Sequence, residues 1–349
     1  MASADPYAVL APFGWNDRVL ASFRTVANGP ELSPARVVRV VRSACAAATV
    51  GGERMAEWVA DLSDFPVVGD WIAIETLAER TIVRSVLPRW SELIRLDPLG
   101  DRSQVLAVNV DIVFITAPAD RPSVARVERE SVVAWESGAR PVVVVTKVDL
   151  DAEAYVQELR RRLVGVDIIA TSATSGAGVD LIAEQLRPNR TAVVLGPSGA
   201  GKSTLINALL GEERLATGAV RDEDARGRHT TTTRELVVIP SGGVVIDTPG
   251  IRGLGMWSDG AGLEAAFADI TALAAGCRFR DCHHDGEPGC AVVAAMAAGA
   301  LDRDRFEHYR KLDREIATDP RKFDPAIRRA ERERTKAANA EQRRARKQS

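Results

Sequence analysis

The stretch AVVLGPSGAGKSTLINALL at residues 192–210 constrains the fold of this chain more than any other segment. It contains an apolar run, a glycine-rich turn that matches G-x-x-x-x-G-K-[ST], and a segment of helical character. Glycines in such a turn let backbone N–H groups curl around phosphates, and the following helix points its positive end at them. The stretch therefore predicts a phosphate loop between a buried strand and a helix.

The predicted loop contains a lysine and a hydroxyl group for phosphate and metal. Lys202 would reach the β- and γ-phosphates, which also makes it a predicted catalytic residue, and Ser203 would bind Mg²⁺. The alternative is a glycine-rich turn with a solvated lysine. The predicted phosphate-binding residues are Gly196, Pro197, Ser198, Gly199, Ala200, Gly201, Lys202, Ser203 and Thr204.

Two segments after the phosphate loop predict a magnesium site and a switch. Asp247 ends the apolar run VVID and begins a D-x-x-G motif with Gly250. An aspartate there can hold Mg²⁺ through water, and the Gly250 N–H can meet the γ-phosphate. The run RHTTTT provides Thr230, Thr231 and Thr232 for closure over Mg²⁺, and we favour Thr231 and Thr232. The alternative is a polar loop that leads into a strand.

Two segments before the phosphate loop predict base recognition. The run VVVVTKVDL contains Thr146, Lys147 and Asp149 and is similar to the N-K-x-D motif that reads guanine. Asp149 can accept two hydrogen bonds from guanine that adenine cannot donate, and the Lys147 stem can lie over the base. Thr146 replaces the usual Asn, which predicts a weaker tie to the phosphate loop. Ser172 and Ala173 match an S-A-x motif at a strand end. The alternative is a K-x-D of the kind common on surfaces.

The order of these segments is rotated, because in most small GTPases the guanine-reading segments follow the phosphate loop. A sheet opened at a different loop keeps the same site, since the termini of a domain usually lie close together. Short apolar segments over residues 36–98 predict a small antiparallel β-barrel. From about residue 104, apolar strands alternate with amphipathic segments, which predicts a doubly wound parallel α/β sheet.

The cysteines predict a structural metal. Three thiolates and one imidazole at short spacing suit a tetrahedral Zn²⁺, and the alternative is free buried cysteines. His283 is the alternative to His284 as the imidazole ligand, and we interpret Cys45 as a core residue. The predicted zinc ligands are Cys277, Cys282, His284 and Cys290.

Composition and charge are those of a cytoplasmic protein with a basic end. The 349 residues are 46% hydrophobic and 27% charged. We expect no membrane span and no signal peptide, because no apolar run is long enough and the N-terminus lacks a basic start. Residues 321–349 contain eleven Lys or Arg and four Asp or Glu, a net charge of +7. This tail predicts a polyanion partner, with a solvated helix end as the alternative.

On these residues the chain resembles the RsgA family, circularly permuted GTPases that depend on the small ribosomal subunit. The resemblance covers roughly residues 36–315 and rests on PVVGDW, TKVDL, GPSGAGKSTLIN, RHTTTTREL, DTPGIR and the cysteine cluster followed by HYRKL. It implies slow GTP hydrolysis that the small subunit stimulates during late subunit maturation. The implied cofactors are GTP or GDP, Mg²⁺ and one structural Zn²⁺.

The resemblance also implies a domain order and partners. We expect a monomer in the cytoplasm that binds the small ribosomal subunit and its rRNA and no membrane. The predicted domains are an N-terminal extension (1–35), an OB-fold (36–100), a permuted GTPase domain (101–257), a helical zinc-binding domain (258–320) and a basic tail (321–349).

One catalytic role stays open in the sequence. Ras-type enzymes place a glutamine after D-x-x-G to orient water, whereas this chain has Ile251. We hypothesise that His229 orients the water, and the alternative is a surface-loop histidine. Two other functions compete: an RNA-binding assembly scaffold with bound nucleotide and little turnover, and a P-loop ATPase or kinase.

Overall fold

The computed structural model of the chain describes residues 5–27, 31–58, 62, 64–78, 80–96, 103–215, 234–247 and 260–318. The chain divides into two compact units, Met1–Gly255 and Met256–Ser349. Several sequence predictions fall outside the described residues. They concern His229, Thr230, Thr231, Thr232, Gly250, Ile251 and the basic tail.

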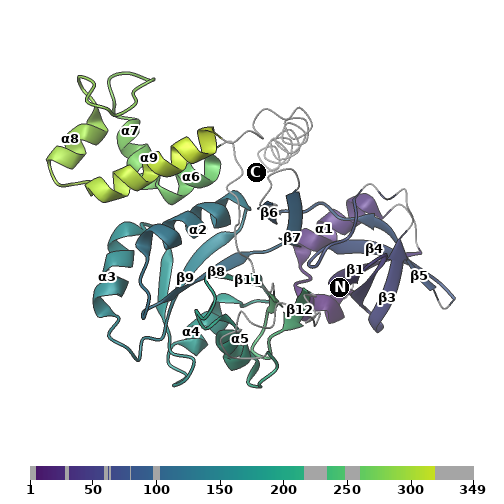
Figure 1. Cartoon of the computed structure of the whole chain (residues 1–349). Coiled ribbons are helices and arrows are strands. Elements are labelled where there is room, and N and C mark those ends of the chain that lie inside the picture. Colours follow the sequence, from purple (N-terminus) through teal and green to yellow (C-terminus); the bar gives the residue numbers. More distant parts are fainter. Residues whose placement is uncertain are drawn as a thin grey trace, which may run out of the picture. The chain divides into compact units, whose positions relative to one another are not determined.

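Five strands of the N-terminal unit close into a barrel (Figure 1). Their order is β1-β2-β3-β5-β4, and β4 pairs back with β1. Small and β-branched side chains such as Ala47, Ile72 and Val83 fill the interior. The predicted β-barrel is confirmed, and its first strand begins before the predicted boundary at residue 36. The strands are β1 (Leu32–Val41), β2 (Ala44–Thr49), β3 (Gly52–Trp58), β4 (Trp71–Leu77) and β5 (Arg80–Val86).

A short helical segment precedes the barrel and packs on it. It consists of the 3-10 helix η1 (Ala8–Phe13) and α1 (Asp17–Val26). Asn16 caps α1, because its side chain accepts a hydrogen bond from the Val19 N–H at 3.1 Å. Trp15 meets Trp71 of β4 edge to face, with ring centroids 5.3 Å apart. These aromatic contacts bury the N-terminal segment against the barrel.

The rest of the N-terminal unit is built on strands in the order β10-β9-β8-β11-β13-β12. Neighbouring strands are parallel except for the antiparallel pair β12–β13. The predicted doubly wound parallel sheet is therefore confirmed. The strands are β8 (Ile112–Pro118), β9 (Arg140–Thr146), β10 (Asp167–Ala170), β11 (Thr191–Leu195), β12 (Glu235–Val238) and β13 (Val244–Asp247).

Helices cover both faces of this sheet (Figure 1). Side chains alternate along β9, so Val143 and Val145 pack with α2 and α3, whereas Val142 and Val144 pack with α4 and α5. This alternation explains the continuous apolar runs in the sequence, because strands buried on both faces need no polar side. The helices are α2 (Val124–Glu136), α3 (Glu153–Arg162), α4 (Val179–Gln185) and α5 (Lys202–Leu210).

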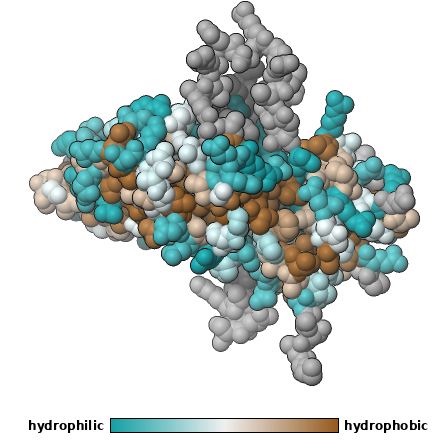
Figure 2. Space-filling model, turned by 90° about the horizontal axis from the view of Figure 1, so that it is seen from below, coloured by the Kyte–Doolittle hydropathy of each residue, from teal (hydrophilic) through white to brown (hydrophobic). Residues whose placement is uncertain are grey.

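The barrel and the sheet are joined by backbone pairing. β1 of the barrel pairs with β12 at Arg39 and Glu235, so the strands of the barrel and of the α/β part form one continuous hydrogen-bonded sheet. A separate hairpin, β6 (Glu92–Leu96) and β7 (Ser103–Val108), lies between the two in the sequence. Polar and apolar residues are interspersed on the face drawn in Figure 2. Within the described ranges, no helix has the length and apolar character that a membrane crossing requires.

The C-terminal unit is helical in its described part, residues 260–318, as predicted. Arg305 of α9 is 3% exposed; it pairs with Asp269 of α7 at 2.6 Å and lies over the Phe267 ring. Asp302 caps α9 by accepting a hydrogen bond from the Asp304 N–H at 2.8 Å. The helices are α6 (Ala261–Ala266), α7 (Ala268–Ala274), α8 (Ala291–Ala297) and α9 (Arg303–Ala317).

Candidate nucleotide and metal sites

The predicted phosphate loop connects β11 to α5. Gly196, Gly199 and Gly201 have φ values of 138°, 72° and 84°, which glycine adopts without steric cost. At Gly196 there is also no room for a side chain, because a Cβ would lie 2.0 Å from Thr116 Oγ1. The Thr116 hydroxyl donates to the Leu195 carbonyl at 2.8 Å. Thr116 of the neighbouring strand β8 therefore leaves room only for glycine at the first position of the motif.

The lysine of the loop lies within its curl. Lys202 Nζ donates to the carbonyl oxygens of Gly196 at 3.0 Å and of Pro197 at 2.8 Å. Ser203 and Thr204 follow in the first turn of α5 and are half-buried. A cation, turned loop glycines and a helix N-terminus therefore converge at one point, which is the chemistry that binds phosphate.

Asp247 stands at the end of β13, beside the phosphate-loop strand β11. Burial raises the pKa of Asp247, and the facing Glu235 carboxylate raises it further, whereas Lys202 lowers it. Lys202 begins α5 directly after the phosphate loop, and Asp247 ends the strand that pairs with β11. Together with the Ser203 hydroxyl, Asp247 supplies oxygen ligands of the kind that Mg²⁺ prefers.

The base-reading loop is tied to the phosphate loop. The Thr146 hydroxyl donates to the Ala200 carbonyl at 2.9 Å, and both residues are buried. Thr146 therefore makes the tie that we expected to be weaker in the absence of Asn. Asp149 is exposed, and its carboxylate accepts a hydrogen bond from the Ser172 hydroxyl at 2.7 Å. The two predicted guanine-reading segments thus meet in space, with Ala173 next to them.

The structure gathers the described members of the predicted nucleotide site at the carboxyl ends of β9, β10, β11 and β13. Ligands bind at this edge in doubly wound sheets. Direct contacts of these residues with nucleotide stay a prediction. The sequence reasoning missed Asp120, which pairs with Lys147 at 2.6 Å. No motif marks Asp120, because it follows a strand that carries none of the predicted GTPase motifs.

The predicted metal ligands form a cluster in the C-terminal unit. Cys277, Cys282, His284 and Cys290 bring their ligand atoms within 4.8 Å of one another. The sulfurs of Cys277 and Cys290 are 3.8 Å apart, and His284 Nδ1 lies 3.6 Å and 3.4 Å from them. A tetrahedral ion with Zn–S bonds of about 2.3 Å separates its sulfurs by about 3.8 Å. The cluster therefore fits a tetrahedral metal ion.

A carboxylate orders the loop that contains the third ligand, His284. Glu287 accepts hydrogen bonds from the backbone N–H groups of His283 at 2.9 Å and Asp285 at 2.7 Å. Backbone N–H donors lower the pKa of Glu287 to about 2. His284 Nδ1 lies beside the cysteine sulfurs, and the His284 backbone has a φ of 60°, whereas His283 is exposed and outside the cluster. His284 is thus the imidazole member of the cluster.

The fold and the site together define a circularly permuted P-loop domain joined to an OB-like barrel. Solved structures of known proteins share this fold. YjeQ from Thermotoga maritima aligns with a TM-score of 0.64 at 25% identity over 82% of this chain and 99% of its own. A structure titled as YloQ, a circularly permuted GTPase, aligns with a TM-score of 0.61 at 22% identity over 83% and 97%.

Sequence comparison identifies the family. The model described as RsgA GTPase matches residues 86–257. A Streptomyces coelicolor protein named small ribosomal subunit biogenesis GTPase RsgA is 45% identical over 90% of this chain and 88% of its own. A protein of the same name from Opitutus terrae is 43% identical over 94% and 95%. The chain belongs to the RsgA GTPase family, which confirms the predicted family, fold class and enzyme class.

Proposed function

We propose that this chain hydrolyses GTP when it is bound to the small ribosomal subunit, and that it acts in late maturation of that subunit. The names of the relatives support the reaction and the process. The observation that carries the proposal is the tie between the two loops, in which Thr146 of the base-reading loop donates to Ala200 of the phosphate loop. This tie holds a guanine-selective group and a phosphate-binding group in one site.

The geometry supports the following proposed roles. Asp149 accepts hydrogen bonds from guanine, and Lys202 exchanges its two loop carbonyls for the β- and γ-phosphates. Ser203 and Asp247 would hold Mg²⁺, which when bound neutralises the charge that develops between the phosphates. Loss of the γ-phosphate would remove its contact with the D-x-x-G segment that begins at Asp247. In the sequence, this segment leads directly into the C-terminal unit.

Water positioning is assigned to His229. Ile251 follows D-x-x-G and cannot hydrogen-bond, so another group must orient the attacking water. Both residues lie outside the described ranges. We expect His229→Ala to lose subunit-stimulated turnover while GTP binding stays intact. Unchanged stimulated turnover in this variant would contradict the assignment.

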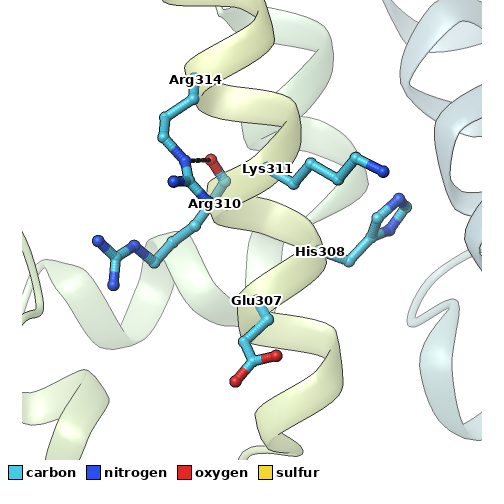
Figure 3. A pocket seen from close by; sticks show the side chains of 5 residues that line it. All are labelled: Glu307, His308, Arg310, Lys311 and Arg314. Carbon is cyan, nitrogen blue, oxygen red and sulfur yellow. Dashed lines mark hydrogen bonds between the residues drawn. The ribbon is translucent and has the colours of Figure 1, made fainter.

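A polyanionic partner, rRNA, is supported by basic surfaces. Arg310, Lys311 and Arg314 line a pocket along α9 together with His308 and Glu307 (Figure 3). Lys311 and Arg314 are exposed, whereas Arg310 also pairs with Asp285. Arginine and lysine side chains on one helix suit a phosphate backbone, and the basic tail adds further charge. The OB-like barrel is a fold that binds nucleic acid in many proteins.

The metal cluster is proposed to hold one structural Zn²⁺. Four protein ligands leave no open position for a substrate, so the ion would stabilise the helical unit without taking part in hydrolysis. We further propose that the protein works as a monomer in the cytoplasm, where ribosomal subunits mature and thiolates stay reduced.

The test is GTP turnover with and without purified small ribosomal subunits, with large subunits as the control. We expect a rise of about tenfold or more with small subunits alone, as for other GTPases that a partner activates. Tight GTP binding without any rise would favour the scaffold. Equal competition by ATP and GTP would favour the ATPase or kinase and would contradict the role of Asp149.

A further inference from the structure

A loop outside the predicted GTPase motifs lies between the two halves of the nucleotide site. It follows β8, and β8 pairs on one side with the phosphate-loop strand β11 and on the other with the base-reading strand β9. The carboxyl ends of parallel neighbours lie at one edge of a sheet, so this loop must emerge between the other two. The Ala119 N–H donates to the Thr146 carbonyl at 3.0 Å, which fixes the start of the loop against the base-reading side.

Two charged side chains of this loop contact different halves of the site, and they also form an ion pair of 3.9 Å with each other. Asp120 accepts a hydrogen bond from Lys147 Nζ at 2.6 Å, and Lys147 lowers the pKa of Asp120. Arg121 Nη2 donates to the Ser198 carbonyl at 3.1 Å. A Cβ at Gly199 would lie 3.1 Å from the same nitrogen, so the guanidinium lies against the outer turn of the phosphate loop.

We propose that Asp120 and Arg121 form a clamp that couples the base-reading loop to the phosphate loop, with Asp120 as a positioning residue that holds Lys147 for the base. The clamp rests on the proposed function, because it acts on guanine nucleotide. An ammonium on a flexible four-carbon stem loses rotamer freedom when it orders over a base. Because Asp120 already holds the Lys147 ammonium before nucleotide binds, this loss of rotamer freedom no longer opposes binding. Arg121 keeps the outer loop carbonyl in place when Lys202 leaves the loop for phosphate.

A double-mutant cycle on the full chain tests the Asp120 half, with fluorescent mant-GDP as the probe. Asp120→Asn removes the charge, and Lys147→Met keeps the apolar stem but removes the ammonium. We expect Asp120→Asn to weaken mant-GDP affinity about tenfold in the wild-type background and less than about twofold in the Lys147→Met background. Equal weakening in both backgrounds, or none in either, would overturn the role of Asp120.

The matched control is Asp167→Asn, which breaks the exposed Arg140–Asp167 ion pair of 2.6 Å at the opposite end of β9 and β10. We expect this control to bind mant-GDP like the wild type. For the other half, Arg121→Gln is expected to speed mant-GDP dissociation about fivefold, and an unchanged rate would overturn its role. Failure of the wild type to bind mant-GDP would contradict the proposed function itself, whereas tight wild-type binding with unaffected variants would contradict only the clamp.

Discussion

At the scale of single residues, buried polar side chains decide how the site is held together. Thr146 is 5% exposed, and its hydroxyl pairs with the carbonyl of a fully buried residue, Ala200. A buried carbonyl that loses its partner carries the full cost of its desolvation. Threonine can therefore replace the usual asparagine at this position because one donor is enough to satisfy that carbonyl.

We expect Thr146→Val to lower both stability and nucleotide affinity. Valine has the shape of threonine without the donor, so the Ala200 carbonyl would be left unpaired at a cost of about 1–3 kcal/mol. Urea unfolding and mant-GDP binding would measure the two effects. Thr146→Ser keeps the hydroxyl and serves as the control. Equal behaviour of the valine and serine variants would show that the tie contributes nothing.

The four cysteines are expected to differ in reactivity. Cys45 is fully buried in the barrel, and burial raises the pKa of Cys45 to about 12. Its thiolate is then almost absent at pH 8, and the thiolate is the reactive form. After chelation of metal, iodoacetamide at pH 8 should modify the other three cysteines and spare Cys45, as mass spectrometry would show. Labelling of all four in urea is the control, and labelling of Cys45 in the folded protein would contradict this burial.

At the scale of elements, strand β1 belongs to both the barrel and the α/β sheet. It pairs with β2 and β4 in the barrel and with β12 in the sheet. Arg36 of β1 is fully buried; it donates to Thr191 Oγ1 at 3.1 Å at the start of the phosphate-loop strand and lies over the Trp71 ring. Burial lowers the pKa of Arg36 to about 10. The Arg36 guanidinium therefore carries its charge at the junction of barrel and sheet, although its burial is unfavourable.

This penalty predicts an order among substitutions at Arg36. Arg36→Met removes the buried charge and fills most of the space, so we expect it to cost about 1 kcal/mol or less. Arg36→Ala leaves a cavity as well, and we expect a cost of about 3 kcal/mol. Urea unfolding followed by tryptophan fluorescence would measure both. If methionine destabilised as strongly as alanine, the hydrogen bonds of the guanidinium would be the dominant contribution.

At the scale of the whole molecule, the two units depend on different forces. The N-terminal unit has apolar layers on both sides of its sheet. The described part of the C-terminal unit consists of three short helices and the longer α9 around a few large side chains, with the Cys and His cluster beside them. Small domains with a limited apolar core often need a metal or disulfides to fold.

Metal removal is therefore expected to unfold the C-terminal unit alone. Chelation by 1,10-phenanthroline should abolish amide protection over α6–α9 and leave protection of β8, β9 and β11 unchanged in hydrogen exchange. Mant-GDP affinity should stay within about twofold of the untreated protein, because no ligand of the cluster belongs to the nucleotide site. Re-addition of Zn²⁺ is the control. Retained protection over α6–α9 after chelation would show that the helices fold without the ion.

Local chemistry made much of the site predictable. The phosphate loop could be predicted because its glycines, lysine and serine act within a single turn of backbone, and their spacing alone specifies that turn. The cysteine spacing likewise indicated a metal cluster, although His283 and His284 stayed alternatives until the contacts of the His284 ring with the cysteine sulfurs distinguished them. The barrel and the doubly wound sheet followed from apolar runs whose length and alternation reflect burial on one or two faces.

These local pieces and their rotated order can be predicted from the amino-acid sequence alone. Which distant side chains meet depends on how the strands and helices pack. Thr146 and Ala200 are 54 positions apart, and Arg36 and Thr191 are 155 apart. Asp120 meets Lys147 because β8 pairs with β9, and no periodicity in the chain records that strand order. Such contacts arise from the packing of whole strands, so residue spacing cannot reveal them.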